Sequence, residues 1–211
     1  MVSRMKKSLA VLLAVATVAG SSLTAFAASS STTPTTPAEA ASSVTSSSVE
    51  VATVPTTSSV AGIKTTVAGA YLAKSVTGLA VTSSVADLKA SLGLAANETP
   101  YLIAYDLTSK KNPASFAALD VAAASQNATV VAKFELDFAK RAGNKLTMLN
   151  GGKIPMLVGI KVADFVAGAN YAVICVTPGG AVSVIPATVV ASGALSFEAV
   201  AGQAAYAVVR Y

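Results

Sequence analysis

The chain has 211 residues, of which 53% are apolar and only 12% are charged. Its net charge of +5 overstates its basicity, because Arg4, Lys6 and Lys7 lie in the first seven residues and leave twelve basic against ten acidic side chains. Beyond these, only Lys110-Lys111 and Lys140-Arg141 form basic pairs, which we interpret as solvated loops or strand ends. The sequence therefore excludes the basic patch that a nucleic-acid-binding protein needs.

Histidine is absent and cysteine occurs once, as Cys175. Without histidine the chain has no Ser-His-Asp triad, no imidazole metal ligand and no ordinary general base near neutral pH. One cysteine excludes an intrachain disulfide. Cys175 lies in an apolar run and is expected to be a buried small hydrophobe rather than a nucleophile.

The first 27 residues have the features of a secretory signal peptide. A basic start is followed by about 11 apolar residues from Leu9 to Ala19 and by Ala25-Phe26-Ala27, which is small at both positions that a signal peptidase reads. Cleavage is expected after Ala27. The apolar run is short for a membrane span, which needs roughly 20 residues, so a retained anchor is the alternative. We expect a secreted, extracellular protein with no membrane span after cleavage, either released into the medium or held non-covalently at the cell surface.

Residues 28–60 are predicted to be a disordered linker, because 21 of these 33 residues are Ser, Thr or Pro. Such a low-complexity segment buries too little apolar surface to offset the entropy of ordering it. The linker is interpreted as a spacer, with O-glycosylation as an open alternative. A single β-rich domain is expected over residues 61–211.

The first half of that domain is expected to contain two helices among strands. A hairpin is predicted from residues 63–73 and 78–82, followed by a helix over residues 83–92 with its N-cap at Ser83 or Ser84 and Asp87 in the first turn. A buried strand follows over residues 101–107. Asn112-Pro113 predicts the start of the second helix, which ends near Asn127.

The second half is predicted to be strands joined by tight turns. Alternation over residues 130–138 indicates a strand with one face in the core and Lys133, Glu135 and Asp137 on a solvent face. Strands follow over residues 145–149 and 154–162. An antiparallel meander of four strands closes the chain between residues 171 and 211. The resulting fold class is α+β: a predominantly antiparallel β-sandwich or bent sheet, with two short helices packed on one side.

Six segments of the second half, taken in order, resemble the carboxyl-terminal β-rich modules of secreted and surface proteins of Gram-positive anaerobic bacteria. The segments are residues 144–149, 153–160, 171–176, 180–187, 195–197 and 206–209. The resemblance implies a structural or adhesive part of an extracellular protein, and it carries no functional residues to transfer.

Glu135 and Asp137 are the best candidates for acid–base chemistry, since they lie two residues apart on one strand face, as a pair of glycosidase carboxylates must. With Lys133 they are interpreted instead as solvated surface pairs. No metal site is expected because the acidic residues are single. Gly151-Gly152 and Gly179-Gly180 are expected to be turns rather than phosphate loops.

The expected function is that of a secreted non-enzymatic module that acts by surface contact, as an adhesive or structural component of the cell exterior. Its expected partners are a surface glycan or protein, or a second copy, recruited through tyrosines or a sheet edge. No catalytic residue, cofactor or metal is expected. The alternative is a small secreted hydrolase acting on glycans, with Glu135 or Asp106 as its acid.

Overall fold

The computed structural model describes residues 58–211. The predicted signal peptide and most of the predicted linker lie outside the described residues. The fold begins with a small hairpin of β1 (Ser59–Val60) and β2 (Ile63–Lys64). β1 lies within the predicted linker, so the linker prediction is wrong for its last two residues. They join the fold because Val60 is buried in a small cluster with Ala80, Leu157 and Ala194.

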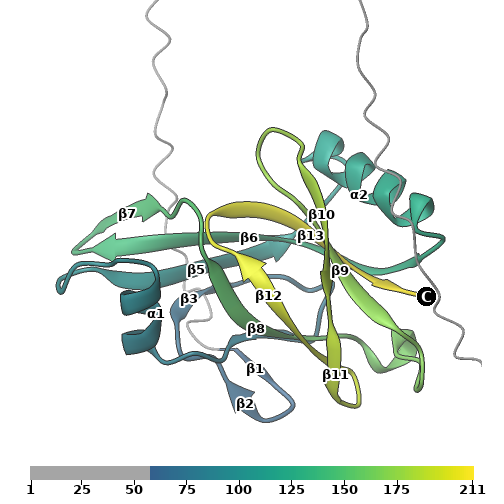
Figure 1. Cartoon of the computed structure of the whole chain (residues 1–211), viewed down its shortest axis with the longest axis horizontal. Coiled ribbons are helices and arrows are strands. Elements are labelled where there is room, and N and C mark those ends of the chain that lie inside the picture. The colour runs from purple at the N-terminus through teal and green to yellow at the C-terminus, as the bar shows by residue number, and fades with distance from the viewer. Residues whose placement is uncertain (1–57) are drawn as a thin grey trace, which may run out of the picture. The chain divides into compact units, whose positions relative to one another are not determined.

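A seven-stranded sheet forms the larger part of the structure, with strand order β10-β9-β13-β6-β5-β3 and β7 paired to β6 (Figure 1). All of its pairs are antiparallel except β3 with β5. Its strands are β3 (Ala68–Tyr71), β5 (Thr99–Asp106), β6 (Thr129–Ala142), β7 (Lys145–Met148), β9 (Tyr171–Val176), β10 (Val182–Pro186) and β13 (Gln203–Arg210).

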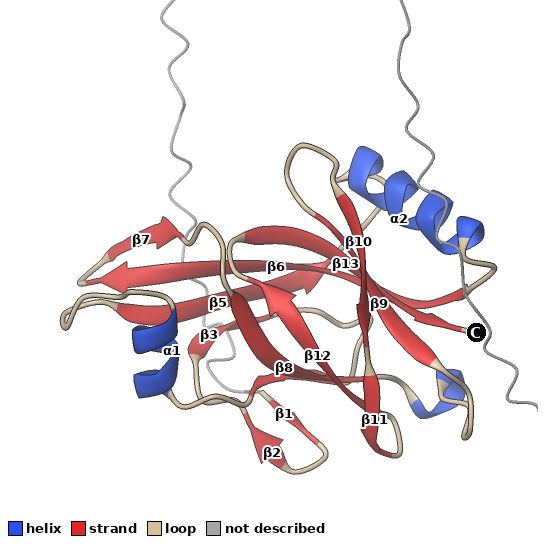
Figure 2. Ribbon diagram, in the orientation of Figure 1, coloured by secondary structure: helices blue, strands red, loops and turns tan. Residues whose placement is uncertain are grey.

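A four-stranded antiparallel sheet has the order β11-β12-β8-β4, and Figure 2 labels its strands β8, β11 and β12. Its strands are β4 (Gly78–Val81), β8 (Lys153–Gly159), β11 (Thr188–Ala191) and β12 (Ala194–Val200). The main core cluster contains side chains of the seven-stranded and the four-stranded sheet. Among them are Phe134 and Tyr206 from the seven-stranded sheet and Phe197 from the four-stranded sheet.

Two short helices and one 3-10 turn complete the described chain: α1 (Val85–Ser91), α2 (Pro113–Ser125) and η1 (Val162–Asp164). The prediction for α1 is confirmed, since the Ser84 hydroxyl accepts the N–H of Asp87 at 3.1 Å and Gly93 follows the helix with φ +63°. No helix within residues 58–211 combines the length and hydropathy needed to span a membrane.

The two helices do not pack on one side, which corrects the prediction. Leu88 of α1 belongs to the main core cluster, whereas Leu119 and Ala123 of α2 belong to a second cluster on the other face of the seven-stranded sheet. Figure 1 shows α1 and α2 near opposite ends of the molecule. The β-rich composition with two short helices agrees with the predicted α+β class.

The predicted hairpin over residues 63–82 is wrong, because β3 and β4 lie in different sheets. The carboxylate of Asp106 accepts the N–H groups of Lys74 and Ser75, at 2.8 and 2.7 Å. These bonds hold the segment after β3 against the end of β5, and the chain then continues to the smaller sheet. Asp106 therefore has a structural role at this crossing.

The carboxyl-terminal strands are not one meander either. Residues 171–211 form five strands, of which β9, β10 and β13 belong to the larger sheet and β11 and β12 to the smaller. The chain changes sheet at Ala187 and again at Gly202. Gly202 has φ +105°, and an added Cβ would lie 2.5 Å from the carbonyl oxygen of Leu149, so this corner requires glycine.

Substituting Phe197 with alanine should lower the free energy of unfolding by about 3–5 kcal/mol, as truncation of a buried aromatic does. Its side chain is 3% exposed, and its ring meets Tyr206 edge-on at a centroid distance of 6.0 Å. Urea denaturation measures the change. The control is Val121→Ala on α2, where Val121 is 70% exposed and the change should stay within about 0.5 kcal/mol. A Phe197→Ala midpoint equal to wild type would contradict the packing.

Candidate functional site

Glu135 lies at the centre of a polar cluster on the face of the seven-stranded sheet that α2 covers. Strand register places Tyr105 of β5 and Ala205 of β13 on either side of it. The exposed fraction of Glu135 is only 4%. The prediction that this residue lies on a solvent face is therefore wrong. Alternation correctly separated the two faces of β6 from Ala132 to Phe138, whereas a register shift against β13 exchanges the faces of Val130 and Val131. Both faces of the strand are covered. One packs into the main core, and the other meets α2 and its neighbours.

Two amide side chains hold the carboxylate of Glu135. Gln203 Nε2 donates to Oε1 at 3.0 Å, and Asn112 Nδ2 donates to Oε2. Asn112 is at the predicted N-cap of α2, yet its side chain makes no capping hydrogen bond. Its amide turns toward the sheet because a buried carboxylate needs donors more than a helix terminus that opens to solvent needs a cap.

Lys133 extends this polar face toward the middle of α2. Its ammonium lies 2.6 Å from Asp120 Oδ1 and 3.3 Å from the centroid of the Phe116 ring. The stem of Lys133 is covered by the helix, and its charge is compensated by Asp120. The predicted surface pairing of Lys133 with Glu135 and Asp137 is replaced by a pair with α2.

Asp137 lies beside the cluster and is half-buried. The Tyr105 hydroxyl donates to its Oδ2 at 3.4 Å, while its Oδ1 is buried without a hydrogen-bond partner among residues 58–211. Burial, and next the nearby charge of Glu135, raise the pKa of Asp137 to about 6. Burial also raises the pKa of the Tyr105 hydroxyl, with further contributions from Glu135 and Asp137.

A pocket of about 500 Å³ opens next to Glu135, and we call it the polar pocket. Its walls are the first turns of α2, the start of β13 and the turn that follows β9. That turn contains Gly179 and Gly180, both with positive φ, as expected for a turn. Asp137 and Tyr105 are not part of the pocket wall.

A second surface feature lies at the sheet edges, where β10 ends the larger sheet and β11 ends the smaller. Only Ala187 separates these strands in the chain. They expose four valines, with exposed fractions of 42–51%: Val182, Val184, Val189 and Val190. We call β10 and β11 with these side chains the valine edge.

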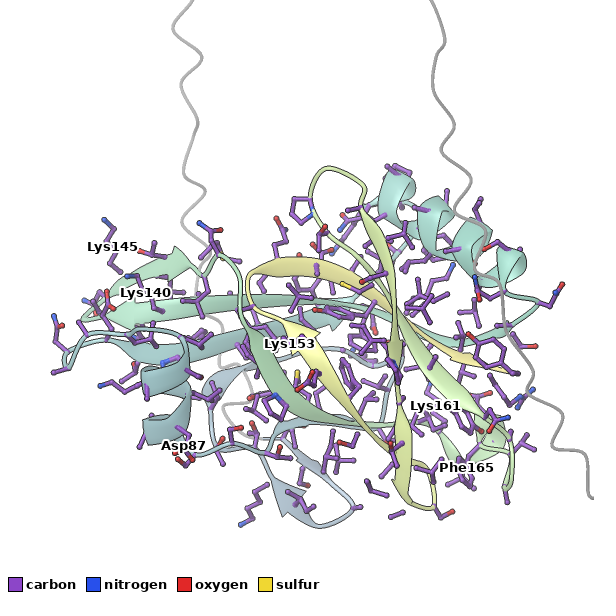
Figure 3. All side chains as sticks on the ribbon, in the orientation of Figure 1. Asp87, Lys140, Lys145, Lys153, Lys161 and Phe165 are labelled. Carbon is purple, nitrogen blue, oxygen red and sulfur yellow. The ribbon has the colours of Figure 1, made fainter. Side chains whose placement is uncertain are left out.

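The valine edge carries no charge. Residues 165–197 contain no Asp, Glu, Lys or Arg. The lysines labelled in Figure 3 come from β6, β7, β8 and the loop before η1. Edge strands are commonly protected by lysine or other charges, because an unpaired edge is a template for another strand. Here the protection comes from the short length of both strands, from Pro186 and from the irregular register of β11 between Val189 and Ala191, and no charge adds to it.

The remaining candidates from the sequence have structural surroundings. Cys175 is fully buried as predicted, and burial raises the pKa of its thiol. Tyr206 and Tyr171 are buried in the core, whereas Tyr211 is 48% exposed. Within the described part of the chain, no three acidic or cysteine side chains form a group that could hold a metal ion.

Asp137→Asn should stabilise the protein at neutral pH. A carboxyl whose folded pKa lies above its unfolded value favours folding below about pH 4, and this contribution is lost as the pH rises through about 6. The difference in unfolding free energy, variant minus wild type, should therefore increase by about 1 kcal/mol between pH 4 and pH 7. This value is well below full conversion, because the side chain is only half-buried.

Denaturation of both proteins at several pH values measures that difference. Asp87→Asn, at the exposed amino end of α1, is the control, and its profile should lack this rise. A difference for Asp137→Asn that stays constant from pH 4 to pH 7 would show that Asp137 keeps an ordinary pKa.

Comparisons with protein families, curated proteins and solved structures gave no match for this chain. The two surface features are therefore interpreted from their own chemistry.

Proposed function

We propose that this protein is a secreted, non-enzymatic module that acts by surface contact, as a structural or adhesive component outside a Gram-positive cell. The observation that carries the proposal is the valine edge. Two consecutive edge strands expose apolar side chains and unpaired backbone groups, and no charge discourages an incoming strand. The signal-peptide features of residues 1–27 support export.

The proposed occupant of the valine edge is a second copy of the chain. An uncharged edge meets its own copy without electrostatic repulsion, and antiparallel pairing of one strand with itself gives a closed two-fold dimer. Such a dimer would bury the valines and satisfy the free backbone groups of the edge strands. A surface glycan or protein is the other expected class of partner.

The proposal also includes the finer architecture, in which the two larger sheets pack face to face as a β-sandwich. It is supported by the main core cluster, which joins Phe134 and Tyr206 of one sheet with Phe197 of the other. In a sandwich of this kind the edges are the natural places for strand addition, since both faces of the larger sheet are already occupied.

Lysine at the valine edge should abolish self-association. Wild type is expected to form dimers whose fraction rises with concentration, whereas Val184→Lys and Val189→Lys should stay monomeric, because a charge at an edge strand opposes pairing. Multi-angle light scattering over a concentration series measures the mass. The matched control is Val121→Lys, which places the same charge on an exposed valine of α2 and should dimerise like wild type.

A wild-type protein that stays monomeric throughout the series would disprove pairing with a second copy. If that monomer sedimented with purified cell walls and Val184→Lys did not, the partner would be a surface polymer. If dimers formed equally in all four proteins, the contact would lie elsewhere on the molecule.

A glycan hydrolase is the second candidate, and the raised pKa of Asp137 next to Glu135 favours it. A carboxyl that keeps its proton near pH 6 is suited to general acid catalysis. The geometry supports it less well than surface contact. Both oxygens of Glu135 already accept amide hydrogen bonds, and Asp137 does not line the polar pocket.

We expect no release of reducing ends when the purified protein is incubated with cell-wall polysaccharide between pH 5 and pH 7. The reducing-sugar assay should give the same background for wild type, Glu135→Gln and Asp137→Asn. Release by wild type that both variants lose would replace the surface-contact proposal with the hydrolase.

A further inference from the structure

The polar pocket combines a buried charge with an open, small-walled space. Glu135 is the one charged side chain among the residues that line it, and the side chain is 96% covered as its 4% exposed fraction shows. The other walls are mainly alanine, valine and proline side chains with glycine backbone. A pocket of about 500 Å³ with few polar groups matches the usual form of a small-molecule site.

The neighbouring charges do not neutralise Glu135. Lys133, two residues along β6, is paired with Asp120 at 2.6 Å and is covered by Phe116. On the other side, Asp137 adds negative charge when it is ionised. A ligand that enters this pocket therefore meets a negative potential, which favours a cation over a neutral or anionic group.

The hydrogen-bonding groups define the ligand further. A carboxylate only accepts, so the NH₂ groups of Asn112 and Gln203 must face Glu135, and their amide oxygens are turned elsewhere. A carboxylate oxygen has two lone pairs, so each Glu135 oxygen can accept one donor besides its amide. The Tyr105 hydroxyl also interacts with Glu135 and uses part of this capacity. Ser115 and Thr177 add two hydroxyl groups to the walls. The pocket thus offers acceptors at Glu135 and at the two hydroxyl groups, and it suits a ligand with several N–H and O–H donors.

We propose that the polar pocket binds an amino sugar, with the protonated amine against Glu135 and ring hydroxyls against the amide and hydroxyl groups of the walls. The alanine and valine side chains would contact the C–H groups of the ring, since no aromatic ring lines the pocket. No residue of the pocket wall belongs to β10 or β11, so the valines of the valine edge are not part of this site.

D-Glucosamine, D-glucose and N-acetyl-D-glucosamine form the test set, because they share a ring and differ in the charge at one position. Titration of the ¹⁵N-labelled chain should show glucosamine shifting amides of residues 112, 114–118, 176–177, 179–180 and 203–205. Its affinity should exceed those of both neutral sugars by at least tenfold and weaken in higher salt. Equal affinities for the three sugars, or no shifts at millimolar glucosamine, would overturn the proposal.

Two variants test separately the contribution of the Glu135 charge and that of the pocket volume to binding. Glu135→Gln should reduce the glucosamine affinity at least tenfold, to that of glucose, whereas Ala118→Leu should fill the pocket and weaken all three sugars. The control is Glu198→Gln, which removes an exposed carboxylate of β12 and should bind like wild type. If Glu135→Gln does not fold, Ala118→Leu decides alone, and an unchanged glucosamine affinity in either folded variant contradicts the site.

Discussion

The carboxylate of Glu135 is the constraint around which one face of the larger sheet is arranged. A buried carboxylate is costly unless donors replace water, and here the donors come from two separate elements. Asn112 brings the start of α2 to β6, and Gln203 brings the start of β13. Loss of either amide would leave a buried charge with an unsatisfied oxygen. The position of α2 on the sheet therefore depends on a polar contact as well as on the alanine-rich stripe of the helix.

The same contact explains the shape of the polar pocket. The buried side chains of α2, Leu119 and Ala123, lie further along the helix and pack on apolar side chains of β9 and β13. At the amino end of α2 the sheet below changes from apolar to polar, and the short side chains of the first turns leave space beside the Thr177–Gly180 turn. The pocket lies where the hydrophobic packing between α2 and the sheet ends. There the amides of Asn112 and Gln203 connect the start of α2 and of β13 to Glu135 by hydrogen bonds.

The sequence predicted most of the local structure, since caps and alternation depend on neighbouring residues. Ser84 caps α1 and Asp87 lies in its first turn as expected, and β6 alternates as expected from Ala132 to Phe138. The sequence did not predict which strands pair, because the direction that the chain takes after a turn depends on contacts with distant residues. Gly202 resembles an ordinary hairpin glycine, yet the Leu149 carbonyl against it directs β12 and β13 into different sheets.

The prediction that Glu135 faces solvent was also wrong because the answer depends on distant parts of the chain. Alternation reports which residues share a face, but it does not report what covers that face. The one local signal was Asn112 before Pro113, which suggested a helix cap, and no short-range pattern indicates that its amide reaches 23 residues along the chain to a carboxylate. Gln203 gave no signal at all.

By contrast, the uncharged stretch over residues 165–197 is visible in the sequence, although its meaning requires the topology. In an internal strand the absence of charge follows from burial, whereas on β10 and β11 it leaves two edges open.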